Sequence, residues 1–205
     1  KGPMGIMAPV LALGGHVALA KRWDVLRDPR LLFGVLITGI LLIPMCIGLY
    51  EQHGTHGLRF YFWEQSFGRL TGENRWKDDS TTFFFTHEVI WQMLPWTVFV
   101  LAGIWASMKG VFQRNAPEFI SISGSVLVFV AISLSQFKLP HYLYAIIPLL
   151  AVLAARAWHA ELPKWLFKAH GAVVILIWSA ALALAAWSFP TGYIPFVSLL
   201  IILMI

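Results

Sequence analysis

Two apolar runs on either side of a short polar segment decide the fold: F-I-S-I-S-G-S-V-L-V-F-V-A-I-S-L-S-Q-F at residues 119–137 and L-Y-A-I-I-P-L-L-A-V-L-A-A-R-A-W at residues 143–158. Runs of about 17 to 25 apolar residues can cross the ~30 Å hydrocarbon core of a bilayer as helices. Backbone groups in lipid must bond within their own segment, so we expect helices here. Between the runs lies K-L-P-H-Y, residues 138–142. Ionisable groups at a membrane boundary are costly to desolvate, which makes this segment a candidate functional site.

The composition is that of an integral membrane protein. Of 205 residues, 59% are hydrophobic and 12% are charged, whereas soluble domains have about 25% charged residues. The net charge of +5 comes from basic residues scattered at the ends of apolar runs, and this pattern argues against a nucleic-acid partner. The single cysteine, Cys46, can form neither an internal disulfide nor, alone, a metal site.

Further apolar runs predict an all-α, polytopic fold with about six to seven transmembrane helices. The prolines within the runs predict kinks. Because the chain starts K-G-P and its last run stops at Ile205, we expect residues 1–205 to be a partial transmembrane domain, truncated at both ends. The other runs are residues 3–20, 31–50, 89–108 and 169–189, with a seventh that starts near Ile194, and the prolines are Pro9, Pro44, Pro95 and Pro148.

The distribution of charge predicts the orientation in the membrane. Nine of the fifteen Lys and Arg residues lie in alternate loops, at residues 21–30, 109–114 and 156–168, and such loops face the cytoplasm. The opposite face then receives Lys1, Lys138 and a long loop at residues 51–88. In this outer loop Phe60, Trp63 and Phe67 recur at helical spacing. They predict an amphipathic helix that lies in the membrane interface.

Three cations and a phenol are thereby expected near the outer face: Lys1, Arg69, Lys138 and Tyr142. Arg binds phosphate through paired hydrogen bonds and Lys acts as a point charge, so the set suits an anionic ligand with a lipid tail. Three of these residues also have a simpler explanation when each is considered alone. Lys138 could reach into the headgroups, Arg69 could contact a headgroup or pair with Glu64 or Glu73, and Tyr142 could belong to an aromatic belt.

Other polar residues carry weaker signals. His53 and His56 lack a third ligand nearby, which argues against a metal site. Glu88 lies near the start of an expected helix, where the helix dipole favours an acid, so capping explains it. His16 lies within the first run without an obvious partner, and we interpret it as a packing residue.

Four motifs in order resemble the lipid-phosphosugar-dependent glycosyltransferases, the superfamily of the bacterial aminoarabinose transferases of lipid A and the protein mannosyltransferases. They cover nearly the whole chain. They are K-G-P at 1–3, F-Y-F-W-E-Q-S-F-G-R-L at 60–70, T-H-E-V-I-W-Q-M-L-P-W at 86–96, and S-Q-F-K-L-P-H-Y-L-Y-A-I-I-P at 135–148.

The resemblance implies a bacterial inner-membrane enzyme that moves a sugar from a polyprenyl-phosphate donor to a lipid or protein acceptor at the periplasmic face. By motif, Arg69 and Tyr142 would bind the donor phosphate, Lys1 would line the same cavity, and Lys138 would support them. The superfamily's acidic catalytic residue lies in an N-terminal half that this chain lacks, so the catalytic base is unknown and the chain alone should be inactive.

The sequence also departs from the superfamily pattern. Gln65 and Ser66 stand where relatives often have Glu-His, and His141 fills a variable position. A divalent metal near outer-loop acids is an option that the resemblance leaves open, although solvated loop acids are the preferred interpretation. The acids concerned are Glu51, Glu64, Asp78, Asp79 and Glu88.

Two rival functions would share the predicted spans. A transporter or flippase of lipid-linked intermediates would also need a basic outer patch, but transporters typically show internal repeats and helices broken near the midplane. No repeat is visible in the sequence. A membrane scaffold is a third option, and it would not explain three cations and a tyrosine on one face.

Overall fold

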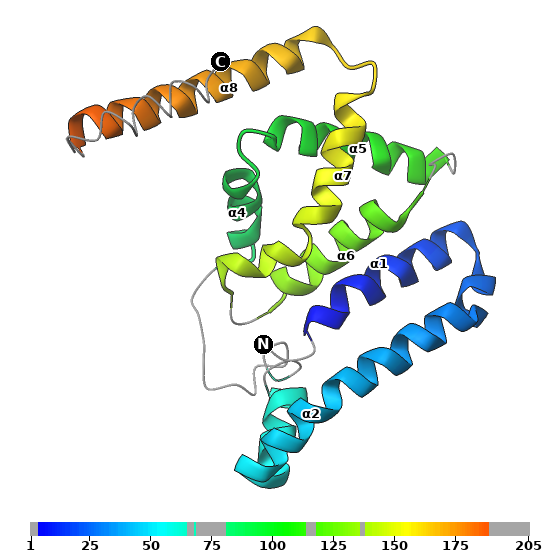
Figure 1. The fold of residues 1–205 in the computed structure, drawn as a ribbon. Coiled ribbons are helices and arrows are strands. Elements are labelled where there is room, and N and C mark those ends of the chain that lie inside the picture. Colours follow the sequence, from blue (N-terminus) through cyan, green and yellow to red (C-terminus); the bar gives the residue numbers. More distant parts are fainter. Residues whose placement is uncertain (1–3, 65–67, 69–80, 114–117, 136–137, 189–205) are drawn as a thin grey trace.

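The computed structural model describes residues 4–64, 68, 81–113, 118–135 and 138–188 (Figure 1). Throughout these ranges the regular secondary structure is helical. The chain is therefore an all-α, polytopic membrane protein. The elements are α1 (Met4–Ala20), η1 (Trp23–Arg27), α2 (Pro29–Arg59), η2 (Phe60–Glu64), α4 (Phe84–Gln92), α5 (Thr97–Gln113), α6 (Ile120–Ser133), η3 (Pro140–Ala145), α7 (Ile147–Trp158), α8 (Lys164–Ala183) and η4 (Leu184–Ser188).

Helices α1 and α6 pack closely because small residues line their contact. A Cβ on Gly15 would overlap the Ser123 side chain, and one on Gly124 would lie 2.6 Å from the Cβ of Ala12. The Ser123 hydroxyl lies 3.0 Å from the Ala12 carbonyl and 2.6 Å from the Phe119 carbonyl, and can donate to one at a time. Since His16 contacts Phe119 while Ala12 contacts Ser123, the two helices run antiparallel.

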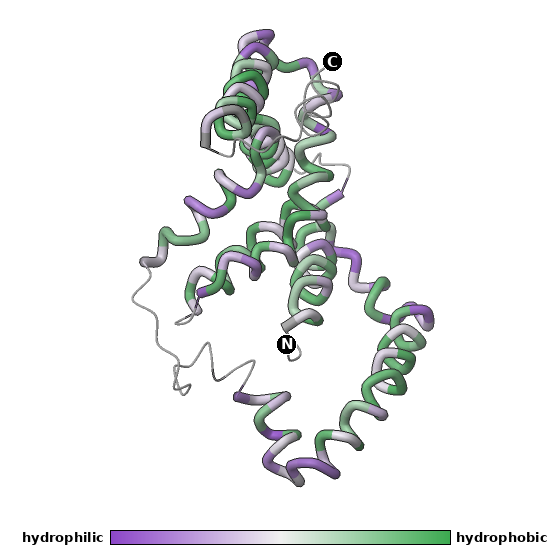
Figure 2. Tube along the Cα trace, turned by 60° about the vertical axis from the view of Figure 1, so that its left-hand side comes forward, coloured by the Kyte–Doolittle hydropathy of each residue, from purple (hydrophilic) through white to green (hydrophobic). Residues whose placement is uncertain are grey.

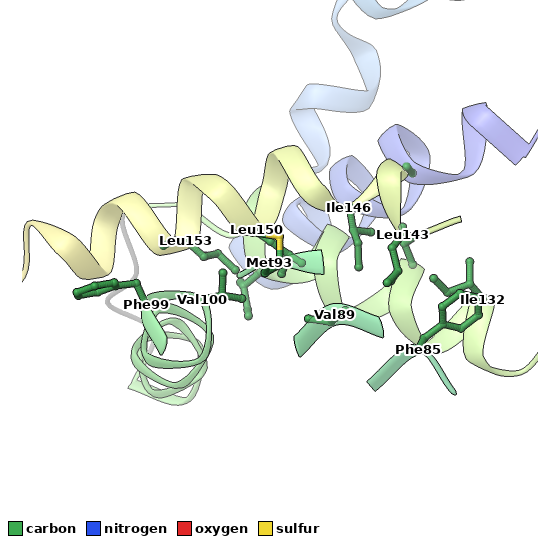
Figure 3. Close-up of a cluster of buried hydrophobic side chains, with 14 of the residues drawn as sticks. Phe85, Val89, Met93, Phe99, Val100, Ile132, Leu143, Ile146, Leu150 and Leu153 are labelled. Carbon is green, nitrogen blue, oxygen red and sulfur yellow. The ribbon is translucent and has the colours of Figure 1, made fainter. Parts of the chain in front are cut away.

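A single apolar core joins α4, α5, α6, η3 and α7 (Figure 3). Phe99 and Val100 of α5 lie against Leu150 and Leu153 of α7. The two helices approach so closely at Gly103 that a Cβ there would overlap the Leu153 carbonyl. At the other end of the core, side chains of α4, α6 and η3 meet, and they are Phe85, Val89, Ile132, Leu143 and Ile146.

Two helices are long and apolar enough to cross a membrane on their own, the α2–η2 segment at Pro29–Glu64 and α8 at Lys164–Ala183. Three more apolar helices are shorter, at Gly5–Ala20, Ile120–Ser133 and Ile147–Trp158. Helices α2 and α8 extend away from the core (Figure 1). Figure 2 shows apolar residues along α2 and polar ones at its ends. The exposed apolar surface on these helices suits contact with lipid.

The kink predicted at Pro95, within the span at residues 89–108, is confirmed, and it is sharp enough to divide the span into two helices. The chain leaves α4 after Gln92 and enters α5 at Thr97, and the two helices are bent by 118°. Pro95 lies in this break, and a proline lacks the N–H that a helix would need there. The carbonyl of Ile90, near the end of α4, accepts a hydrogen bond of 2.7 Å from the hydroxyl of Thr97 on the other side of the break.

The kinks predicted at Pro9 and Pro44 stay predictions. Both prolines lie inside helices, in α1 and α2 respectively. Pro148 instead lies in the first turn of α7, a position where the missing N–H has no intrahelical acceptor in any case. It therefore starts a helix, and the predicted kink is wrong.

The start of the predicted outer loop is helical. Helix α2 continues through residues 51–59, with a non-helical Gly54 at φ 60° and ψ −152°, a backbone conformation that glycine adopts readily. Phe60 and Trp63 are about half exposed, at 45% and 47%. Phe67 lies outside the described residues. The placement of this segment in the membrane interface stays a prediction.

Candidate functional site

The K-L-P-H-Y segment lies between α6 and α7, and its last three residues begin a short helix, η3. Leu139 is extended, with φ −128° and ψ 137°, and Pro140 begins the 3-10 helix η3. The fixed φ of proline suits this first position. The backbone N–H of Tyr142 donates to the Leu139 carbonyl at 3.0 Å. Leu143, with 1% of its surface exposed, anchors the turn in the core.

The two predicted site residues on this element differ in exposure. Lys138 is buried, with 7% of its surface exposed. Tyr142 is half-buried and packs against the apolar core. Its ring also lies edge-on to that of His141, with centroids 5.0 Å apart. The structure therefore holds a lysine and a phenol on one short, well-anchored element.

Helix α4 contacts this element through a polar side chain that the sequence reasoning missed. The Gln92 side-chain Nε2 donates to the Glu88 carboxylate at 2.7 Å and to the Pro140 carbonyl at 3.2 Å. Glu88 lies beyond the first turn of α4, so the predicted capping role is wrong. The spacing of Glu88 and Gln92, at i and i+4, is the signal that could have indicated this pair.

Several segments converge at the end of the core where η3 lies. Since α1 and α6 run antiparallel, the start of α1 lies at the same end as the finish of α6. The start of α4 lies there too, because Phe85 packs with Ile132 and Leu143 (Figure 3). Lys1 and Arg69 themselves lie outside the described residues. The starts of α1 and α4 thus lie at the end of the core that carries η3.

The opposite end of α7 carries a different set of charges. Arg156 Nη1 lies 2.9 Å from Glu118 Oε1, and Glu118 Oε2 accepts from the backbone N–H of Ser121 at 2.9 Å. The backbone N–H of Phe119 donates to His16 Nδ1 at 3.4 Å. His16 therefore has a partner, which the sequence did not reveal. These contacts tie α1, α6 and α7 together.

A cavity of about 340 Å³ lies against the α4–α5 break, and its lining is mainly apolar. Beside it, His170 Nδ1 lies 3.0 Å from the Pro95 carbonyl and the His170 ring packs among those of Trp96, Phe99 and Trp158. Of the predicted phosphate ligands that the structure describes, neither Lys138 nor Tyr142 belongs to the lining. The described lining residues are Met93, Trp96, Ala151, Ala154, Ala155, Trp158 and His159.

The described residues contain no group of three or more His, Cys, Asp or Glu side chains placed to hold a metal ion. Of the outer-loop acids, Glu51, Glu64 and Glu88 are described, whereas Asp78 and Asp79 lie outside those ranges. A divalent metal at the outer loop stays a prediction.

The fold and the site together define a class: a polytopic helical membrane protein with a half-buried tyrosine on a short helix at one end of its core and a buried lysine two residues before that helix begins. No family model matches the chain. Its sequence and fold are nevertheless similar to part of one kind of known protein.

The similar proteins are aminoarabinose transferases. The chain is 24% identical over 157 residues to the undecaprenyl phosphate-alpha-4-amino-4-deoxy-L-arabinose arabinosyl transferase of Edwardsiella ictaluri (strain 93-146), covering 76% of this chain and 27% of that protein. It is 26% identical over 207 residues to the protein of the same name from Enterobacter sp. (strain 638), covering 91% of this chain and 34% of that protein. The chain thus spans about a third of its curated relatives.

A solved structure has the same fold. The crystal structure of ArnT from Cupriavidus metallidurans bound to undecaprenyl phosphate matches with a TM-score of 0.69 and 22% identity, over 94% of this chain and 34% of that one. These comparisons confirm the resemblance that the four motifs indicated. The chain is similar to part of an ArnT-like glycosyltransferase.

Proposed function

We propose that this chain is the C-terminal part of the membrane domain of a glycosyltransferase, which moves a sugar from a polyprenyl-phosphate donor to a lipid or protein acceptor at the outer face of the bacterial inner membrane. The observation that carries the proposal is the burial of Lys138 on the element that also presents Tyr142. Its similarity to transferases named for undecaprenyl phosphate supports the choice of donor.

The burial of Lys138 favours a phosphate site over a membrane anchor. A lysine that reaches into headgroups leaves its ammonium exposed, whereas Lys138 is covered by protein. Lys138 already has an interaction within the chain, so its ammonium is held in place. A cation fixed at this end of the core would add positive potential at a donor phosphate bound there.

The chemistry follows from the charge that develops during transfer. As the bond between sugar and phosphate breaks, negative charge accumulates on the leaving polyprenyl phosphate, and preorganised cations and donors lower the energy of that state. In the proposed site Arg69 and the Tyr142 hydroxyl bind the phosphate, and Lys138 and Lys1 add positive potential. An acidic residue elsewhere in the whole protein would activate the acceptor.

The broken α4–α5 pair is the feature that a transporter would share, because transporters use unwound helices to bind substrate through free carbonyls. Here two carbonyls near the break already have partners within the chain. The Ile90 carbonyl accepts from Thr97, and the Pro95 carbonyl lies 3.0 Å from His170 Nδ1. The break therefore favours a structural role, and the transferase remains the better proposal.

The test is sugar transfer by the full-length protein in membranes, with variants Arg69→Ala and Tyr142→Phe. Losing a charge-assisted contact to the leaving group lowers transfer by about 100-fold for Arg69→Ala, and losing one hydroxyl donor lowers it by about tenfold for Tyr142→Phe. The matched control is Tyr144→Phe, because Tyr144 lies on the same element with 65% of its surface exposed. Near wild-type transfer by both site variants would overturn the phosphate assignment.

A further inference from the structure

The amide of Gln92 joins two elements through both of its hydrogens. One is donated to Glu88, one turn earlier in α4, and the other to the Pro140 carbonyl, 48 residues further along the chain. A side-chain amide has two N–H donors, so both bonds can form together. Gln92 therefore fixes the first peptide of η3 relative to α4.

That peptide controls the path of the backbone to Tyr142. Pro140 starts η3, and its own φ is restricted by the proline ring. The orientation of the Pro140 carbonyl sets the plane of the peptide that leads to His141 and then to Tyr142. A donor held against this carbonyl thus limits the remaining freedom of the turn that carries the phenol.

Glu88 is a carboxylate in a position that is largely covered by protein. Its side chain is only 16% exposed, and its ion-pair partner among the described residues is His87, at 3.9 Å with 80% of the side chain exposed. Taking a carboxylate out of water is costly without strong hydrogen bonds. The bond from Gln92, at 2.7 Å, orients the amide so that its second hydrogen faces Pro140.

We infer that Glu88 and Gln92 are positioning residues, which hold η3 so that Tyr142 is presented to the donor phosphate. The inference rests on the proposed function for the role of Tyr142, but the mechanical link between Gln92 and η3 stands on the contacts alone. Neither residue needs to touch the substrate. The pair acts through the backbone at Pro140.

The first experiment measures the Kd of undecaprenyl phosphate for the full-length protein in lipid nanodiscs. Gln92→Met keeps the size of the side chain and removes the amide, so the Kd rises about five- to tenfold, as expected when an ordering hydrogen bond is lost. Glu88→Ala has a similar effect. Glu88→Gln restores most of the affinity, because its side-chain oxygen can still accept from Gln92. Thr86→Ser, at an exposed position of the same helix, is the control.

A second measurement separates positioning from a general loss of stability. In a Tyr142→Phe background, Gln92→Met raises the Kd less than twofold further, because the contact that it positions is already gone. Hydrogen exchange in residues 139–146 is faster in Gln92→Met, with an unchanged midpoint of thermal unfolding. Unchanged exchange, or an equal loss of affinity with and without the Tyr142 hydroxyl, would overturn the inference.

The outcomes also separate this inference from the proposed function. If the wild-type protein does not bind undecaprenyl phosphate, the proposed function fails. The exchange measurement then still decides whether Gln92 orders η3. If the wild type binds and only the exchange and coupling results are negative, the proposed function stands and the positioning role fails.

Discussion

Glu118 and Arg156 form an ion pair between the start of α6 and the last turn of α7, with Oε1 and Nη1 2.9 Å apart. The second carboxylate oxygen of Glu118 accepts from the backbone N–H of Ser121, so one acid caps a helix and binds a cation at once. Arg156 also lies in the last turn of α7, where a positive charge is favoured by the helix dipole. The pair fixes the end of the core opposite η3.

We expect Arg156→Met to lower the free energy of unfolding by about 0.5 to 1 kcal/mol, since the pair is partly exposed and screened by solvent. The matched control is Arg22→Met, because the Arg22–Asp24 pair has a similar distance of 2.8 Å but side chains 61% and 64% exposed. Thermal unfolding of the two variants in the same membrane mimetic checks this. Equal midpoints for both would show that the partly exposed Glu118–Arg156 pair contributes nothing beyond the fully exposed one.

Adjacent glycines in α1 offer a sharper test of helix packing. A methyl group at Gly15 would overlap Ser123, whereas one at Gly14 meets nothing within 4 Å. Gly15→Ala should destabilise the protein by about 1 to 3 kcal/mol through overpacking. Gly14→Ala should be neutral or stabilise it by up to about 1 kcal/mol, because alanine favours the helix. Equal stability of the two variants would contradict the close α1–α6 approach.

Some features of the fold could be predicted from the sequence and others could not. Apolar runs predicted the helices, because hydrophobic length alone decides whether a segment can cross lipid. Pro95 predicted a kink in the run at residues 89–108, but the bend of 118° between α4 and α5 was not foreseen, because the apolar run continues through Leu94 and Trp96 and hydrophobicity does not reveal how sharply a chain turns.

Contacts between distant residues were also beyond the sequence. His16 meets the backbone of Phe119, 103 residues away, and Gln92 meets Pro140, 48 residues away. In each contact one partner is a backbone group, the Phe119 N–H or the Pro140 carbonyl, which no sequence motif marks. Lys138 and Tyr142 could be predicted as neighbours because they lie close together in the chain, whereas the burial of Lys138 depends on how the surrounding segments pack.

The exposed loop between α1 and α2 gives a prediction for pH dependence. The hydrogen bond from Arg22 lowers the pKa of Asp24 below its ordinary value. The stabilisation that the ionised Asp24 carboxylate contributes is therefore present above the pKa of Asp24 in the unfolded chain. It is lost as the pH falls through the lower pKa of Asp24 in the folded chain. Carboxylate NMR titration checks the direction, and Arg22→Met should return the pKa of Asp24 toward the ordinary value. An unchanged pKa in that variant would show that the hydrogen bond does not form in solution.

The orientation in the membrane can be tested with single cysteines in a Cys46→Ser background. The charge pattern places Glu51 at the outer face and Lys164 at the cytoplasmic face, and both residues are exposed. A membrane-impermeant maleimide added to cells with a permeable outer membrane should label Glu51→Cys and leave Lys164→Cys unlabelled until the inner membrane is opened. Labelling of Lys164→Cys alone would invert the topology. It would place Lys138 and Tyr142 in the cytoplasm, where an outer-face transfer reaction could not use them.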